Sequence, residues 1–439
     1  MSNAHRVLIL GGGFAGLVAA QTLKRADVEI TLLDRRNFHL FQPLLYQVAT
    51  GSLSPAEIAA PLRAVLSRQK NVEVLLGEAM DMDPAVKTVQ LADGDALSYD
   101  TLIIATGSET SYYGREEWRD NAPSLKSIEE ATAMRHKLLY AFERAERTAS
   151  KEEMRAWLNF VIVGAGATGM ELAGALAEIA HQTLKHDFRR IRPQDARIIL
   201  MEGGPRVLAP YPEDLSKKAE GLVKKLGVEV KLGAMVTSID AHGVSYCQGE
   251  TLGTIPARTV LWAGGVTATP FARKVAQCLH AETDRSGRFK VNPDLTIPGH
   301  PEIFVLGDLA LSFDERAHQL PGVAQVAIQG GHYAGKLIKA RLAGGTMPPF
   351  RYFDKGDMAV IGRAAAVANI FGFHVSGFIA WFVWAFIHLL YIVEFQSRIQ
   401  VLIQWGIQYM TFSRSARLIT GELPGGPMSE HPARKVHSK

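Results

Sequence analysis

Two segments of the chain repeat one design, and this repetition constrains the fold more than any other feature. The apolar runs at residues 7–10 and 160–163 are typical of buried parallel strands. Each run meets a GxGxxG turn, with the letters GGGFAG in the first segment and GAGATG in the second, and a helical stretch follows. The next strand of each segment ends on an acid, Asp34 or Glu202. The sequence therefore predicts two βαβ units, each with a tight glycine turn at its first loop.

The residue types in each unit suit the binding of a dinucleotide. The first glycine makes the tight turn, the second lets backbone N–H groups approach a pyrophosphate, and the third lets the helix pack on the strand. The helix N-terminus adds partial positive charge, and the acid at the strand end accepts from ribose hydroxyls. The candidate cofactor-binding residues are Gly11, Gly13, Phe14, Ala15, Gly16, Asp34 and Arg35 in the first unit, and Gly164, Gly166, Thr168, Gly169 and Glu202 in the second.

The composition excludes several classes of protein. The hydrophobic content of 47% is that of a globular enzyme, and a net charge of +4 does not demand nucleic acid as a partner. Cys247 and Cys278 lie far apart, so neither a zinc cluster nor a redox dithiol is expected, and no metal site is predicted. The N-terminus lacks the pattern of a signal peptide, which favours a cytoplasmic location.

Two further strands carry marks of a flavin-binding domain. Residues 99–107 (YDTLIIATG) form a strand ending in a turn that resembles the crossover of flavoproteins with two dinucleotide domains. Residues 303–308 (IFVLGD) end in Gly-Asp, and in that superfamily the Asp, here Asp308, holds the ribityl chain of FAD. A helix N-cap is the alternative reading of this Asp. FAD is thus expected in the first unit and a nicotinamide dinucleotide in the second, where Glu202 favours NADH because a carboxylate repels the 2′-phosphate of NADPH.

The composition changes after about residue 346. Residues 375–393 are almost continuously apolar, and a second stretch has apolar side chains at helical spacing and glutamines at every fourth position from Gln396 to Gln408. Arg398, Arg414 and Arg417 flank this stretch, as expected of arginines that reach the polar boundary of a bilayer. Attachment to one membrane face is favoured over one true span or a buried dimer core. Residues 424–439 are expected to be disordered.

Over most of its length the chain resembles the type II NADH:quinone oxidoreductases. The resemblance rests on residues 34–51 (DRRNFHLFQPLLYQVATG), 168–174 (TGMELAG), 324–330 (AQVAIQG), 354–356 (DKG) and 361–363 (IGR). Residues 357 and 358 (DM) depart from the commoner small residues of the family. The resemblance implies peripheral attachment and a homodimer. Together with the cytoplasmic location favoured by the N-terminus, it places the expected protein on the cytoplasmic face of the cell inner membrane.

The family also implies roles for individual residues. Glu171 is expected beside the nicotinamide, Gln325 and Gln329 between flavin and quinone, and Lys355 near the quinone. Each has a plainer reading, since Glu171 could serve the helix dipole, the glutamines could be solvated, and Lys355 could be a surface lysine. The remaining cofactor-binding candidates are Ala79, Thr106 and Gly107 for FAD, and Ala263, Gly264 and Gly265 for the nicotinamide dinucleotide.

The expected architecture is an α/β fold of two Rossmann-like dinucleotide-binding domains, one inserted in the other, plus C-terminal amphipathic membrane-binding helices. The expected boundaries are 1–122 and 270–345 for the FAD domain, 123–269 for the NADH domain, and 346–423 for the quinone and membrane region. The expected activity transfers hydride from NADH to FAD and then two electrons to a membrane quinone, without proton pumping. A reductase of a soluble acceptor and a flavin redox sensor are the alternatives.

Overall fold

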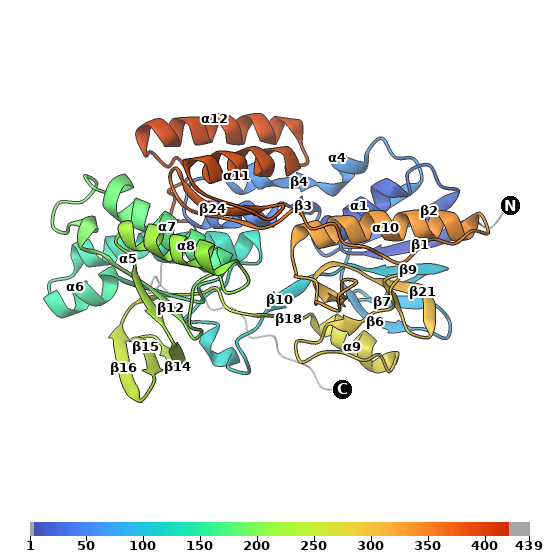
Figure 1. Ribbon diagram of the computed structural model, residues 1–439, viewed down its shortest axis with the longest axis horizontal. Coiled ribbons are helices and arrows are strands. Elements are labelled where there is room, and N and C mark those ends of the chain that lie inside the picture. Colours follow the sequence, from blue (N-terminus) through green and yellow to red (C-terminus); the bar gives the residue numbers. More distant parts are fainter. Residues whose placement is uncertain (1–3, 421–439) are drawn as a thin grey trace.

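The computed structural model describes residues 4–420 and places two lobes side by side, with the C-terminal helices across one face (Figure 1). A six-stranded sheet forms the first lobe, in the order β20-β21-β9-β1-β2-β5. All its pairs are parallel except β20 with β21. The strands are β1 (His5–Leu10), β2 (Val28–Asp34), β5 (Val72–Leu76), β9 (Thr101–Ile104), β20 (Thr296–Ile297) and β21 (His300–Val305).

Two helices cover one face of this sheet and contact each other along their length. Helix α1 (Phe14–Thr22) follows β1, and α10 (Ala324–Leu342) arrives from far down the chain. A Cβ atom added to Gly331 would lie 2.4 Å from the carbonyl oxygen of Ala15, so the two backbones touch. Because only glycine allows this approach, the contact at Gly331 determines how α10 packs against α1. This packing determines where Gln325 and Gln329 lie.

A second, four-stranded parallel sheet forms the other lobe, in the order β13-β12-β11-β17. Its sequence lies between β9 and β21 of the first sheet. The antiparallel pair β10 and β18 connects the lobes where the chain leaves and returns (Figure 1). The strands concerned are β10 (Ser108–Thr110), β11 (Asn159–Val163), β12 (Arg197–Glu202), β13 (Glu229–Leu232), β17 (Thr259–Trp262) and β18 (Val266–Ala268).

Helices and small sheets complete the two lobes. The longer helices are α5 (Ile128–Arg147), α6 (Lys151–Leu158), α7 (Ala167–Glu178), α8 (Glu213–Lys225) and α9 (Pro270–Cys278). The short helices are α2 (Leu45–Ala49), α3 (Pro55–Ile58) and α4 (Leu62–Leu66). The small sheets comprise β3 (Phe38–Leu40) with β4 (Ala59–Pro61), β6 (Ala79–Asp83) with β7 (Thr88–Leu91) and β8 (Ala96–Ser98), β14 (Ala234–Asp240) with β15 (Gly243–Gln248) and β16 (Thr251–Pro256), and β19 (Phe289–Lys290) with β22 (Ala310–Leu311).

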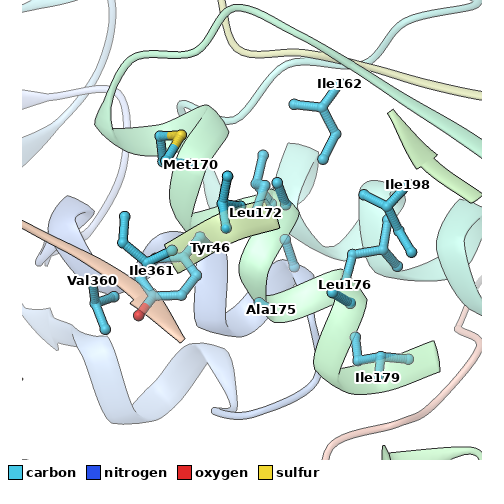
Figure 2. Packing of buried hydrophobic residues seen from close by; sticks show 14 of the residues in the cluster. Tyr46, Ile162, Met170, Leu172, Ala175, Leu176, Ile179, Ile198, Val360 and Ile361 are labelled. Atoms are coloured by element: carbon cyan, nitrogen blue, oxygen red, sulfur yellow. The ribbon is translucent and has the colours of Figure 1, made fainter. Parts of the chain in front are cut away.

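The C-terminal region begins with an antiparallel sheet of β23 (Met358–Gly362), β24 (Ala365–Ile370) and β25 (Phe373–Gly377). It continues as α11 (Phe378–Tyr391) and α12 (Phe395–Thr411). This region shares one hydrophobic core with the second lobe, in which Val360 and Ile361 of β23 pack with Leu172 and Ala175 of α7 (Figure 2). A Cβ atom on Gly174 would lie 1.6 Å from the carbonyl oxygen of Ile361. The C-terminal sheet therefore rests directly on the α7 backbone.

The structure divides the apolar stretch of this region and corrects the position expected for Arg414. Residues 375–377 complete β25, so the apolar stretch 375–393 is divided between a strand and the 14 residues of α11. Within residues 4–420, no helix is long and apolar enough to cross a membrane. Arg414 does not extend to a bilayer boundary, because its side chain is 7% exposed and pairs with Glu178 at 3.0 Å. The tail expected at residues 424–439 lies outside the described residues.

The contact between α7 and β23 predicts a sharp difference between two helical glycines. Gly174→Ala should lower the melting temperature, because a methyl group there must displace the backbone of Ile361 and overpacking costs roughly 1–3 kcal/mol. Gly221→Ala in α8 is the matched control, since a Cβ there meets nothing within 4 Å. It should leave the melting temperature unchanged or raise it, because Ala favours a helix by about 1 kcal/mol over Gly. Equal thermal shifts in the two variants would contradict the contact.

Candidate functional site

The two glycine turns have the same geometry at every position that matters. Gly11 and Gly164 adopt φ of +104° and +102°, which other residues rarely adopt. A Cβ on Gly16 would lie 1.9 Å from the carbonyl oxygen of Gly11, and a Cβ on Gly169 would lie 1.8 Å from that of Gly164. The first and third glycines are thus required by the packing of helix on strand.

The second glycine of each turn has a different environment. Gly13 and Gly166 are exposed, have ordinary negative φ, and would carry a Cβ into open space. The protein's own packing therefore does not require glycine at either position. A ligand that approaches the backbone closely does, and the start of a helix is suited to a phosphate.

The acids at the strand ends hold these turns by the same pair of contacts. Asp34 accepts from the backbone N–H of Gly12 at 2.6 Å, and Glu202 accepts from that of Ala165 at 2.8 Å. The second oxygen of Asp34 accepts from the N–H of Arg36 at 2.7 Å, and that of Glu202 accepts from Gly204 at 2.8 Å. Each carboxylate oxygen has a further lone pair, so both acids can still receive ribose hydroxyls.

Unpartnered buried atoms test whether FAD would fit the first lobe. Within the described part of the chain, Thr106 Oγ1 and Gln325 Oε1 are buried without a hydrogen-bond partner. Such atoms are costly unless a ligand or water completes them. Thr106 follows β9, and Gln325 begins α10 beside α1. A polar ring or ribityl chain along these elements would supply the missing partners, so the residues present fit the cofactor.

Asp308 lies in a short polar network between the lobes. Its Oδ2 accepts from Ser108 Oγ at 2.6 Å, and Lys126 Nζ donates to the same hydroxyl at 3.2 Å and lies 3.8 Å from Asp308. The backbone of Asp308 belongs to a 3-10 turn after β21 and does not begin an α-helix. The N-cap reading is therefore less suitable than a ligand-facing role.

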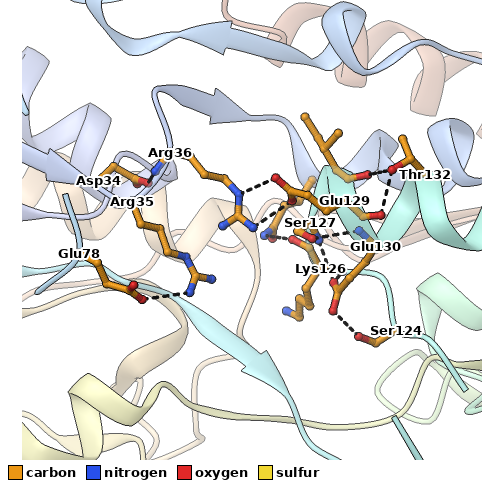
Figure 3. A network of polar contacts seen from close by, with 12 residues as sticks. Asp34, Arg35, Arg36, Glu78, Ser124, Lys126, Ser127, Glu129, Glu130 and Thr132 are labelled. Carbon is orange, nitrogen blue, oxygen red and sulfur yellow. Dashed lines mark hydrogen bonds and ion pairs between the residues drawn. The ribbon is translucent and has the colours of Figure 1, made fainter. Parts of the chain in front are cut away.

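The start of α5 connects this network to the first dinucleotide turn. Arg36, two residues after Asp34, pairs with Glu129 at 3.0 Å, as drawn in Figure 3. Ser127 and Glu130 form a capping box that holds the beginning of the helix. Glu130 also accepts from the backbone N–H of Lys126 at 2.7 Å. The position of the Lys126 ammonium thus depends on the cap of α5.

The residues expected near the acceptor converge on one segment, residues 353–356. Gln325 Nε2 donates to the carbonyl of Gly356 at 3.0 Å. Gln329 both donates to the carbonyl of Phe353 and accepts from its N–H, each at 2.9 Å. Lys355 Nζ donates to the hydroxyl of Tyr391 in α11 at 3.0 Å. Gln329 therefore holds the segment through both ends of its amide, whereas Gln325 holds it through Nε2 alone and Lys355 keeps two further donor protons.

Glu171 lies in the first turn and a half of α7, half-buried between α2 and β23. Burial raises the pKa of its carboxyl well above the usual range, and a hydrogen bond from the backbone of Val360 opposes the shift. Tyr46 of α2 lies on the same side, next to Ile361 (Figure 2). The carboxyl is not among the described ion pairs, so Glu171 is more than a charge placed for the helix dipole.

The other expected residues occupy varied environments. Ala15 is buried under α10, Arg35 is exposed and 3.8 Å from Glu78, and Ala79 begins β6. Gly107 has φ of +67° and open space at its Cβ position. Thr168 lies in the first turn of α7, while Ala263, Gly264 and Gly265 follow β17 beside Gly164. The three residues after β17 thus border the second glycine turn.

Sequence reasoning missed His39 and Lys126. His39 is 2% exposed, and its Nδ1 bonds the carbonyl of Gly12 at 2.9 Å, so it holds the first turn from the side opposite Asp34. It lies within the quoted motif 34–51, but nothing in the pattern separates it from its neighbours. Lys126 could have been found, because the capping box after it marks the beginning of a helix.

Comparisons with known proteins agree with this geometry. A family described as pyridine nucleotide-disulphide oxidoreductase matches residues 5–331. A protein of Mycobacterium tuberculosis, described as type II NADH:quinone oxidoreductase Ndh, is 45% identical over 95% of this chain and 91% of its own length. The chain belongs to the type II NADH:quinone oxidoreductases. A member of this family from Staphylococcus haemolyticus is 28% identical over 85% of this chain and 92% of its own length.

Solved structures show the same fold. The structure of NDH2 from Plasmodium falciparum in complex with NADH has a TM-score of 0.85 at 19% identity, covering 94% of this chain and 99% of that one. The mixed α/β fold of the family is therefore confirmed for this chain.

The environment of Glu171 predicts a pH dependence of stability. A raised folded pKa means that the folded state keeps a proton that the unfolded chain loses above about pH 4.5, so stability falls as pH rises through this window. Gln cannot ionise, so the melting temperature of Glu171→Gln should equal that of the parent near pH 5 and exceed it near pH 8. Glu178→Gln is the matched control on the same helix, and it should lower the melting temperature at pH 8 because it leaves Arg414 buried without its partner. If the increase in melting temperature caused by Glu171→Gln did not grow with pH, the raised pKa of Glu171 would be contradicted.

Proposed function

We propose that the chain is a non-proton-pumping NADH:quinone oxidoreductase that uses FAD, with NADH and quinone handled by different parts of the protein. One observation carries the proposal, namely that two glycine turns of equal geometry open toward ligands in a chain that belongs to this family. FAD, when bound, accepts hydride from NADH and delivers two electrons to the quinone. The remaining steps belong to the protein's own side chains.

In the first lobe we propose that Gly13 admits the pyrophosphate of FAD and that Asp34 receives the ribose hydroxyls. Asp308, Ser108 and Lys126 would hold the ribityl chain, since their hydroxyl, carboxylate and ammonium groups already lie within 3.8 Å of one another. The unpartnered oxygens of Thr106 and Gln325 would form hydrogen bonds with the cofactor. The domain division at residues 123 and 269 is part of this proposal, because β10 and β18 pair at the crossing.

In the second lobe we propose that Gly166 admits the pyrophosphate of NADH and that Glu202 selects it over NADPH by repelling a 2′-phosphate. An arginine near this acid would favour the 2′-phosphate of NADPH. The guanidinium of Arg206, four residues after Glu202, instead donates to the carbonyls of Tyr211 and Ala209. Glu171 would border the nicotinamide. Burial raises the pKa of its carboxyl and so favours the neutral form, which can donate a hydrogen bond and would not repel the hydride.

On the acceptor side we propose that Gln325 and Lys355 donate to the quinone oxygens, where negative charge grows as electrons arrive. Gln329 would act as a positioning residue, because both ends of its amide hold the backbone of Phe353. Tyr391 would aim Lys355 through their 3.0 Å hydrogen bond.

Stopped-flow measurement of the two half-reactions tests this division. Lys355→Met should slow reoxidation of the flavin by quinone about 100-fold, the scale expected for loss of one donor aimed at developing charge, while NADH still bleaches the flavin at the parent rate. Glu171→Gln should do the reverse, changing reduction by NADH more than reoxidation. Lys336→Met is a control for charge alone, because Lys336 lies on α10 away from residues 353–356. Equal slowing of both half-reactions by Lys355→Met would exclude separate sites.

We further propose that the exposed side of α11 and α12 attaches the protein to a lipid bilayer, on the cytoplasmic face of the membrane, where NADH is available. Phe378, Phe382 and Phe386 of α11 are exposed by more than half, and their spacing places them on one side of the helix. On α12 the half-buried Gln408 contacts the body of the protein while large apolar residues face outward. The exposed apolar residues of α12 are Phe395, Ile399, Leu402, Ile403, Ile407 and Met410. A homodimer is proposed from family membership alone.

Sedimentation with phosphatidylcholine and phosphatidylglycerol vesicles tests the attachment. Phe382→Asp and Phe386→Asp should each lower the vesicle-bound fraction about tenfold or more, because burying one such side chain contributes ~1.5–3 kcal/mol. Leu252→Asp is the matched control, since Leu252 is 80% exposed on the hairpin of β15 and β16, far along the second lobe. If Leu252→Asp reduced binding as much as the α11 variants, binding would not depend on this face.

A further inference from the structure

A pocket lies between α7, β23 and the two C-terminal helices, and Glu171 is the one candidate site residue from the sequence among the described residues that line it. Its empty volume is about 730 Å³, including the open mouth. Five parts of the chain meet there, namely α2, α7, β23, α11 and α12. None of Gln325, Gln329 and Lys355 lines the pocket, so it is distinct from the acceptor site proposed above.

The walls of the pocket are aromatic. Trp384 of α11 lies 5.3 Å from Trp405 of α12, measured between ring centroids, and Trp381 lies 5.3 Å from Tyr409. The two pairs are inclined by 34° and 33°. Flat faces of this kind favour a planar ring as occupant, because offset stacking adds to the burial of apolar surface.

The acidic and basic groups at the back of the pocket are already satisfied by one another. Glu178 accepts from the guanidinium of Arg414 at 3.0 Å and from the backbone N–H of Arg363 at 2.5 Å. Arg414 also donates to Ser52 Oγ at 2.7 Å and to the carbonyl of Thr50 at 3.2 Å. The pair of Glu178 and Arg414 therefore offers a charged ligand no free counter-ion, which favours a neutral occupant at this end of the pocket.

Three of the remaining polar groups can donate hydrogen bonds to a ligand. Trp384 is 2% exposed, and in the part of the chain that the structure describes its Nε1 has no acceptor. Arg363 stacks on Tyr409 and Phe412, with its guanidinium carbon 4.3 and 4.1 Å from their ring centroids, and its side chain has no ion pair within residues 4–420. Tyr46 accepts from Gln47 Nε2 at 2.9 Å, which leaves the Tyr46 hydroxyl proton available.

We propose that this pocket binds a neutral planar ring that carries carbonyl acceptors, with Trp384 Nε1 as the donor that the ligand completes. An unpartnered buried N–H is costly in a native structure, and a carbonyl on a flat ring satisfies both the donor and the aromatic walls. A quinone headgroup has this chemistry, and so has an aromatic lactone or lactam that cannot accept electrons. The occupant would contact Glu171, and so the wall of the proposed nicotinamide site.

Calorimetric titration of the FAD-loaded, oxidised protein tests the proposal with coumarin, a neutral planar lactone that takes no part in the reaction. Trp384→Phe keeps a ring and removes the donor, and it should weaken coumarin binding about tenfold, the usual scale of one hydrogen bond. Trp157→Phe is the matched control, because it makes the same substitution at a half-buried tryptophan that does not line the pocket. It should bind coumarin like the parent.

Ala175→Leu provides a second variant, which fills the pocket from α7 and should abolish coumarin binding without touching Trp384. Coumarin binding that survives both Trp384→Phe and Ala175→Leu, or that is lost in Lys355→Met instead, overturns the proposal. Titration with 2,3-dimethoxy-5-methyl-1,4-benzoquinone then distinguishes the sources. A Trp384-dependent component identifies the quinone headgroup as an occupant, and its absence assigns the pocket to rings that are not substrates. Because binding is measured without NADH, this outcome does not depend on whether the proposed reaction is correct.

Discussion

The contact between the first and third glycines of each turn is the constraint on which the rest of the structure depends. At 1.9 and 1.8 Å from a hypothetical Cβ to a carbonyl oxygen, these contacts allow only hydrogen at Gly16 and Gly169. They draw α1 and α7 onto the ends of β1 and β11, so that backbone N–H groups point out of the turn at Gly13 and Gly166. The strand-end acids and His39 then hold the turns in place. All other proposed ligand contacts are arranged around these two points.

Helix α7 extends this constraint to the C-terminal region. Its first turn follows the second glycine turn, its middle touches β23 at Gly174, and its last residue, Glu178, pairs with Arg414 beyond α12. The C-terminal sheet and helices are therefore part of the second lobe's core and are not an appended anchor. A connection of this kind keeps α11 and α12 in a fixed position relative to the second glycine turn.

Environment separates carboxylates that look alike in the sequence. Asp34 and Glu202 each accept two backbone N–H groups from the turns that they hold. Glu178 is buried with a guanidinium. Glu171, one helix turn and a half into α7, has no ion pair among the described residues, and burial raises its pKa against one opposing hydrogen bond from the backbone of Val360. The proposed division of roles follows from these differences, because a neutral carboxyl can donate where an ionised one can only accept.

The sequence by itself determined the two βαβ units, the strand ends at Asp34 and Glu202, and the helix that carries Gln325 and Gln329, because glycine spacing and apolar runs are local signals. Only the tertiary structure decided that the Gln329 amide is hydrogen-bonded to the backbone of Phe353, that Lys355 donates to Tyr391, and that Arg414 is buried. It also divided the apolar stretch 375–393 between β25 and α11, although the composition is uniform there. The pocket beside Glu171 is built from five separate segments. No local sequence pattern predicts this pocket, because it is stabilised by contacts between residues that lie hundreds of positions apart.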